Sequence, residues 1–152
     1  MNQFKFRLQG LLKLREFKEH KAKIELGKIN QQISDVQSEL ARLSRHIDEG
    51  YNSQEKFLEK PTPARMIQFF PYFNHGIREH IKSMHLKLNE LNQKYNEKMK
   101  ELNRLKGEVD VIEKLKEKEK KKFIKKIEKK IEENIQDTIL MNEFRKKIKE
   151  AS

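Results

Sequence analysis

The stretch AKIELGKINQQISDVQSELARLSRHI, residues 22–47, decides the fold of this chain. Its apolar residues recur at alternating intervals of four and three, which places them on one face of an α-helix. Eight consecutive positions keep this spacing: Ala22, Leu26, Ile29, Ile33, Val36, Leu40, Leu43 and Ile47. Such a seam is typical of a coiled coil. Leu8 and Leu12 keep the same phase upstream and the pattern weakens at Gly50, so we expect a first helix over about residues 6–58.

A second seam of the same kind follows in residues 77–112. Its positions are Ile77, Ile81, Met84, Leu88, Leu91, Tyr95, Lys98, Leu102, Leu105, Val109 and Ile112, of which only Lys98 is polar. One turn between two such seams predicts an antiparallel helical hairpin. The second seam stops after Ile112. In a hairpin, the start of the first helix would lie opposite the second helix close to this residue. The expected fold class is therefore all-α, with two long helices in an antiparallel coiled-coil hairpin and a second helix that overhangs at the open end.

The turn is predicted from the prolines, which all lie between residues 59 and 76, at positions 61, 63 and 71. Thr62 followed by Pro63 is typical of an N-cap with proline at the first helical position. Pro71 is expected to kink or split the helix that starts there. The expected organisation is a single hairpin over residues 1–152, with a turn at about 59–62, a second helix at about 63–149 and an overhang at about 115–152.

Composition argues against a catalytic domain. Of the 152 residues, 39% are charged and 35% are hydrophobic, well below the roughly 45–50% apolar content of globular chains. The absence of cysteine excludes disulfides, thiolate metal sites and cysteine nucleophiles. The five histidines lack metal-ligand spacing, and no glycine-rich phosphate loop occurs. We expect no enzyme activity, no cofactor and no metal, and the lack of a long apolar run favours a cytoplasmic protein.

The surplus of positive charge is concentrated in two blocks. The chain has a net charge of +11, of which residues 5–28 contribute +5 and residues 113–130 contribute +6. A hairpin would bring both blocks to its open end. The second block runs into a stripe of five isoleucines without a partner in the hairpin: Ile124, Ile127, Ile131, Ile135 and Ile139. This segment is either a solvated helix or a surface for a partner that is anionic, apolar-grooved or both.

Aromatic residues cluster around the predicted turn, at the closed end of the hairpin. They are Tyr51, Phe57, Phe69, Phe70, Tyr72 and Phe73. They either pack the turn or form a partner surface, and the second reading is favoured because a tip of two helices cannot easily bury six aromatic side chains.

The N-terminal segment FKFRLQGLLKLREFKEHKAKIEL, from Phe4 to Leu26, resembles the opening of the flagellar FliJ proteins. The family pattern is two aromatics, a leucine, paired leucines, Leu-Arg, and then Glu, Ala and Leu at helical spacing. It is matched here by Phe4, Phe6, Leu8, Leu11, Leu12, Leu14, Arg15, Glu19, Ala22 and Leu26. The length, the hairpin and the charged C-terminal helix agree as well.

The resemblance implies a non-catalytic component of the flagellar type III export apparatus, located peripherally at the inner membrane. Its partners would be the hexameric export ATPase, the export-gate membrane protein and substrate-specific export chaperones. The open end would insert into the ATPase and promote its assembly and activity. The residues expected to dock there are Phe4, Leu8, Leu11, Leu12, Leu14, Arg15, Lys18, Lys121, Ile124, Ile127 and Ile131. The aromatic patch at the closed end would face the export gate.

Four alternatives stay open on sequence grounds. The docking residues of the first helix could be no more than the first turns of the seam. The basic end could bind nucleic acid, although the absence of arginine in residues 113–130 would make such binding non-specific and salt-dependent. The chain could also be a scaffold that dimerises through its isoleucine overhang, or the related stalk of a virulence secretion system.

Overall fold

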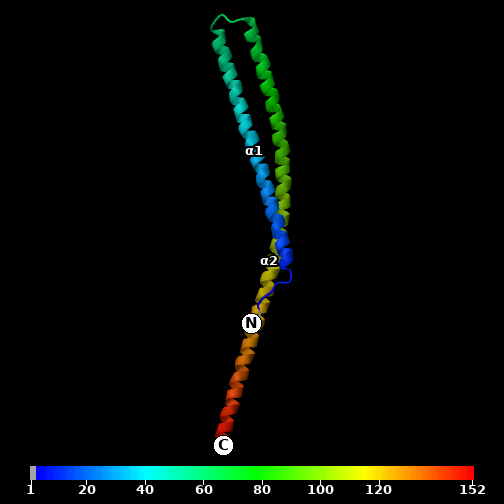
Figure 1. Cartoon of the computed structure of the whole chain (residues 1–152), viewed down its shortest axis with the longest axis vertical. Helices are drawn as coiled ribbons and strands as arrows, with labels where there is room; N and C mark the ends of the chain where they lie inside the picture. Colours follow the sequence, from blue (N-terminus) through cyan, green and yellow to red (C-terminus); the bar gives the residue numbers. More distant parts are fainter. Residues whose placement is uncertain (1–2) are drawn as a thin grey trace. The chain divides into compact units, whose positions relative to one another are not determined.

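The structure is a computed structural model that describes residues 3–152, and within them it contains two helices and no strand. Helix α1 spans Gln9–Leu58 and helix α2 spans Ala64–Ala151. The two helices run antiparallel on either side of a single turn (Figure 1). Neither helix has a stretch long and apolar enough to cross a membrane.

The chain divides into two compact units, and each contains part of both helices. One unit is Lys18–Arg104, which includes the turn, and the other combines Met1–Phe17 with Leu105–Ser152.

In the unit Lys18–Arg104 the two predicted seams form the contact between α1 and α2. A central cluster contains Ile33, Val36 and Leu91, with flanking contacts from Ile29, Leu40, Met84, Leu88 and Tyr95. Each seam position predicted in residues 22–47 is buried or half-buried, and their neighbours on the outer face are exposed. The predicted antiparallel coiled-coil hairpin is confirmed.

In the other unit the start of the chain packs against α2. The core cluster consists of Phe6, Leu12, Val109 and Ile112, with Phe4 and Leu8 packed against it. Helix α1 begins at Gln9 rather than near residue 6. Phe6 is buried and lies in a turn before the helix, in which its carbonyl accepts a hydrogen bond from the Gln9 N–H at 3.2 Å. Helix α2 continues beyond this cluster, and all residues from 131 to 152 are exposed. The second helix therefore overhangs as predicted, although the start of the chain still contacts Phe123, beyond the expected start of the overhang at about residue 115.

Thr62 stabilises the turn, but its side chain bonds to the end of α1 and not to the start of α2, where it was expected to act as an N-cap. Its hydroxyl donates to the carbonyl oxygens of Phe57, at 2.5 Å, and Lys60, at 2.9 Å. The hydroxyl therefore bonds to one carbonyl in the last turn of α1, where backbone carbonyls lack intrahelical partners, and to one carbonyl of the turn. The carbonyl of Pro63 accepts the N–H of Met66 at 3.0 Å and so starts α2.

Pro71 lies inside α2, which continues through it without a break. The ring removes the N–H that would bond to the carbonyl four residues earlier. The surrounding turns are held by aromatic packing, since the rings of Phe57 and Phe70 approach to 5.7 Å across the hairpin. The helix is therefore not split at Pro71.

Candidate functional site

Three of the eleven residues expected to dock at the open end lie in or against a hydrophobic core cluster. Leu12 is only 3% exposed, and Leu8 and Phe4 pack against the same cluster. The ring of Phe4 also lies 5.5 Å from that of Phe123 on α2. Ile127 on α2 is half-buried. Phe4, Leu8 and Leu12 therefore contribute to the packing between the start of the chain and α2.

Arg15 has a structural partner as well. It occupies a seam position of α1, and its guanidinium lies 3.2 Å from the carboxylate of Glu108 on α2. Both side chains are one-third exposed. Arg15, a charged residue at a seam position, is therefore accommodated by an ion pair across the hairpin.

The remaining docking candidates of α1 point outward. Leu11, Leu14 and Lys18 are exposed, with half of the Leu14 surface open to solvent. Phe17, which sequence reasoning missed, belongs to the same surface and is 64% exposed. Its spacing of three residues from Leu14 puts both on one face of a helix, and this signal could have found it. We call Leu11, Leu14 and Phe17 the outer strip.

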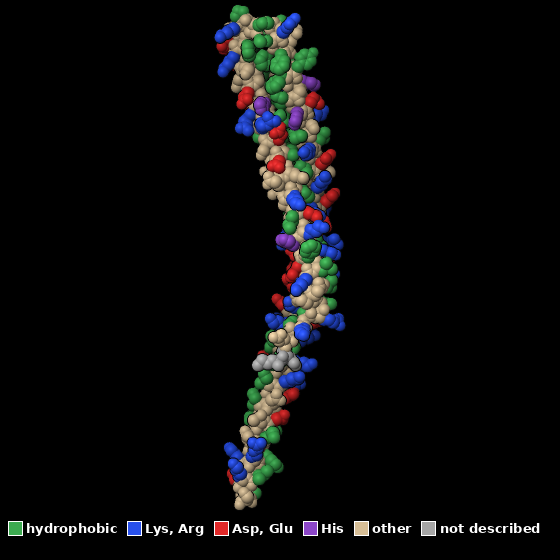
Figure 2. All heavy atoms as spheres, in the orientation of Figure 1, with side chains coloured by type: hydrophobic (Ala, Val, Ile, Leu, Met, Phe, Trp, Pro, Cys, Tyr) green, Lys and Arg blue, Asp and Glu red, His purple; other side chains and the backbone are tan. Residues whose placement is uncertain are grey.

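On α2 the docking candidates Lys121, Ile124 and Ile131 are exposed. They belong to the Lys-rich block and to the isoleucine stripe. Figure 2 shows hydrophobic side chains open to solvent along this end of α2, with Lys and Arg among them. The open end therefore presents apolar and basic surface together.

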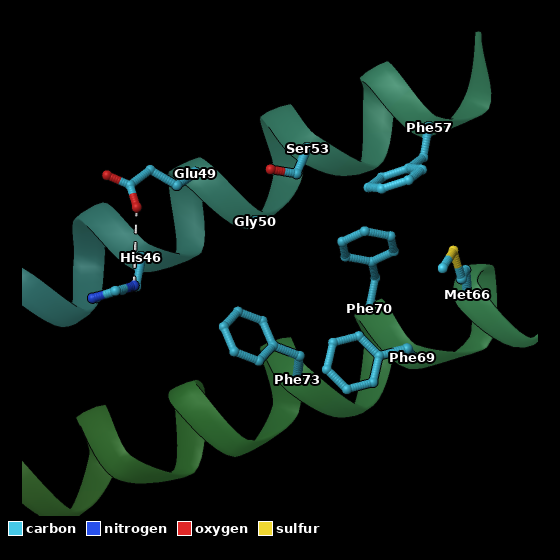
Figure 3. A pocket seen from close by; sticks show the side chains of 9 residues that line it. All are labelled: His46, Glu49, Gly50, Ser53, Phe57, Met66, Phe69, Phe70 and Phe73. Carbon is cyan, nitrogen blue, oxygen red and sulfur yellow. Dashed lines mark ion pairs between the residues drawn. The ribbon is translucent and has the colours of Figure 1, made fainter. Parts of the chain in front are cut away.

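The closed end contains a groove between α1 and α2 with a volume of about 530 Å³. Four phenylalanines of the predicted patch line it: Phe57, Phe69, Phe70 and Phe73 (Figure 3). The ring of Phe69 lies 6.2 Å from Phe70 and 5.9 Å from Phe73. These contacts make a continuous aromatic wall on α2, and Phe57 faces it from α1. Figure 2 shows the hydrophobic side chains gathered near the turn.

The two tyrosines of the predicted patch do not line this groove. The hydroxyl of Tyr51 accepts a hydrogen bond from Arg78, whose guanidinium carbon lies 6.0 Å from the centre of the tyrosine ring. Tyr72 is 80% exposed. Tyr72 lies outside the groove because each residue of a helix is rotated by about 100° from its neighbours in sequence, so Tyr72 faces away from Phe73.

The groove also includes residues that the sequence analysis missed. Met66 extends the aromatic wall, and its spacing of three and four residues from Phe69 and Phe70 could have revealed it. On α1 the lining continues through Gly50, which is buried beside Asn74 and Phe73 of α2. A Cβ atom on Gly50 would lie 3.1 Å from Oδ1 of Asn74, a buried oxygen without a hydrogen-bond partner.

Charged groups border the groove on α1. His46 and Glu49 line it, and His46 Nε2 lies 3.2 Å from Arg42. Arg42 Nε also donates to Glu39 at 2.9 Å. This hydrogen bond lowers the pKa of the Glu39 carboxyl and raises that of the Arg42 guanidinium. Within residues 3–152, no group of three or more acidic, histidine or cysteine side chains is arranged to hold a metal ion.

Two long helices joined by one turn, with apolar side chains exposed at both ends, define the chain as a coiled-coil hairpin protein. A family model described as "Flagellar FliJ protein" matches residues 4–149, and the chain belongs to this family. Family membership makes it a component of the flagellar type III export apparatus. Searches of curated proteins and of solved structures found no match.

Proposed function

We propose that this chain acts as a stalk that inserts its basic open end into the hexameric export ATPase and promotes assembly and activity of the ring. The observation that supports this most directly is the outer strip of α1. Leu11, Leu14 and Phe17 remain exposed although the neighbouring Leu12 is buried. Exposed leucine and phenylalanine side chains on consecutive turns of one helix are suited to binding in an apolar groove of a partner protein.

The charge of residues 113–130 also supports docking of the ATPase at the open end. Residues 113–130 carry ten lysines and four glutamates, and all but a few of these side chains are exposed. A block of this charge attracts an acidic surface at long range and raises the association rate more than the final affinity. We expect docking at the ring to be faster at low ionic strength.

The closed-end groove is proposed as the contact for the export gate, with substrate chaperones as further partners of the hairpin. Its supporting feature is the aromatic wall of Phe69, Phe70 and Phe73, which Phe57 faces from α1. Aromatic side chains are enriched at the centres of protein interfaces. Binding to the gate would hold the protein peripherally at the inner membrane.

The deciding experiment is steady-state ATP hydrolysis by the purified export ATPase, titrated with this protein. Stimulation should saturate well below one chain per ATPase subunit, because one stalk would serve a ring. Replacing Leu11 and Leu14 together by serine should weaken stimulation about tenfold. Leu86→Ser is the matched control, since Leu86 is exposed on α2 in the body of the hairpin.

A second candidate function is supported by the lysine block alone. Ten lysines in eighteen residues would bind nucleic acid without sequence specificity. Absence of ATPase stimulation, combined with binding of duplex DNA that falls steeply with salt, would favour this function over the stalk.

A further inference from the structure

Four of the five isoleucines of the overhang stripe are exposed within residues 3–152, and Ile127 is half-buried. Ile124, Ile131, Ile135 and Ile139 are each about half exposed, with 52% of Ile131 open to solvent. Three successive turns, at Ile131, Ile135 and Ile139, thus present an isoleucine to water, and Ile124 does so two turns before them. A helix without tertiary packing is marginally stable in water even when its sequence favours helix. This stripe is therefore a surface that requires a partner.

Charge in the overhang is separated into blocks of opposite sign. Residues 113–130 have a net charge of +6, whereas residues 131–144 contain four acidic residues and no lysine or arginine. Residues 145–149 are basic again, with four lysines or arginines. Within one helix this order brings like charges together at a spacing of four, as in Lys121–Lys125 and Glu133–Asp137. Such pairs destabilise an isolated helix.

We propose that the overhang pairs antiparallel with the overhang of a second copy of this chain, centred on Ile131. In this register Ile127 of one copy lies level with Ile135 of the other. Lys125 lies level with Asp137, and Lys129 with Glu133. The positive block of each copy thus lies along the acidic block of the other, and the stripe is covered over its full length.

The opposite orientation is unfavourable. A parallel pair would set ten lysines of one copy beside the same ten lysines of the other, and like charges facing each other across a helix pair oppose association. The antiparallel pair avoids that repulsion. It also places opposite charges of the partner copy beside the like-charge pairs of each helix, which reduces their repulsion. From residue 113 to 149 the paired region would be about 55 Å long.

The first test is sedimentation velocity of the full chain over a range of concentrations. We expect a monomer–dimer equilibrium that is abolished by Ile131→Asp. Leu140→Asp is the matched control, because Leu140 is 62% exposed but lies off the stripe, and it should leave the dimer intact. A native chain that is monomeric at all concentrations would overturn the proposal, as would a monomer that binds vesicles of anionic lipid through the stripe.

Charge exchange tests the register. Lys125→Glu with Lys129→Glu should weaken the dimer at least tenfold by facing acidic side chains with acidic ones. Adding Glu133→Lys and Asp137→Lys to the same chain should restore it, since the facing pairs then have opposite signs again. A quadruple variant no tighter than the double variant would contradict this register.

Cross-linking tests the orientation, and the absence of native cysteine makes it unambiguous. A disulfide needs Cα atoms about 4.4–6.8 Å apart. In the proposed register two copies of residue 135 would be separated by about 12 Å along the axis. Ile135→Cys alone should therefore not cross-link, whereas a mixture of Ile127→Cys and Ile135→Cys chains should. Efficient cross-linking of Ile135→Cys with itself would establish a parallel pair and overturn the proposal.

These tests use the purified chain alone, so their outcome is separate from that of the ATPase titration. If both proposals hold, the dimer and the ring would compete for Ile124, Ile127 and Ile131. Adding export ATPase should then dissociate the dimer.

Discussion

Lys98 on α2 forms a salt bridge with Glu25 on α1, and its Nζ atom also lies 2.9 Å from Glu101 on its own helix. Lys98 is the one polar residue in the second predicted seam, so its charge would otherwise lie against apolar neighbours. The hydrogen bond to Glu25, followed by that to Glu101, raises the pKa of the Lys98 ammonium. The hydrogen bond from Lys98 lowers the pKa of the Glu25 carboxyl.

Replacing Lys98 by methionine should make stability less dependent on pH. Because the pKa of Glu25 is lowered from its ordinary 4.5, the pair stabilises the hairpin above that value and is lost as pH falls through the lowered pKa. The pKa of Lys98 is raised from 10.5, so its contribution is present below that value and is lost as pH rises through the raised pKa. Urea unfolding between about pH 3 and pH 7 should show a smaller rise in midpoint for Lys98→Met than for the native chain.

Lys100→Met is the control for this experiment, because Lys100 is exposed on the same helix. It should keep the native pH dependence. If Lys98→Met and the native chain lose stability equally in acid, the ion pair with Glu25 does not contribute.

A second prediction concerns the contact of Gly50 with Asn74. Glycine inside a helix costs about 1 kcal/mol relative to alanine. The methyl group of Gly50→Ala would lie 3.1 Å from Asn74 Oδ1, so the substitution should stabilise the hairpin by less than this amount. In an Asn74→Ala background the gain of about 1 kcal/mol should be recovered.

Gly107→Ala provides the comparison for Gly50, because a Cβ atom there would meet nothing within 4 Å. It should raise the free energy of unfolding by about 1 kcal/mol. Equal gains at Gly50 and Gly107 in the native background would show that the Asn74 contact imposes no strain.

The buried and exposed leucines of the open end should differ in their effect on stability. Leu12→Ala should cost about 2 kcal/mol or more, because it leaves a cavity beside Val109 and Ile112. Leu14→Ala should change stability by about 0.5 kcal/mol or less, since Leu14 is half exposed. Thermal unfolding of the two variants would measure the difference, and a similar loss in both would mean that Leu14 is packed.

The closed-end groove predicts a contrast between two neighbouring aromatics. Phe69→Ser should weaken binding to the cytoplasmic part of the export gate by about tenfold, which is about 1.4 kcal/mol. Tyr72→Ser should have little effect, because Tyr72 does not line the groove. Isothermal titration of both variants against the same gate fragment would make the comparison. Greater loss with Tyr72→Ser would assign the contact to the outer face of α2.

Much of the fold could be predicted from spacing alone. The alternation of threes and fours in residues 22–47 and 77–112 identified the buried face of each helix. These features are local, because the helical repeat fixes which side chains share a face. The same argument could have added Met66 and Phe17 to the candidate surfaces.

What the tertiary structure decided is which residues meet across the hairpin. Leu11 and Leu12 are equally apolar, yet only Leu12 enters the core. Four phenylalanines of the closed-end cluster line one groove, whereas Tyr51 bonds to Arg78 instead. The pairing of Lys98 with Glu25 and of Gly50 with Asn74 depends on the register between α1 and α2. That register is set by the length of the turn and by the packing of both seams together, so the sequence of either helix by itself determines its faces but not its partners.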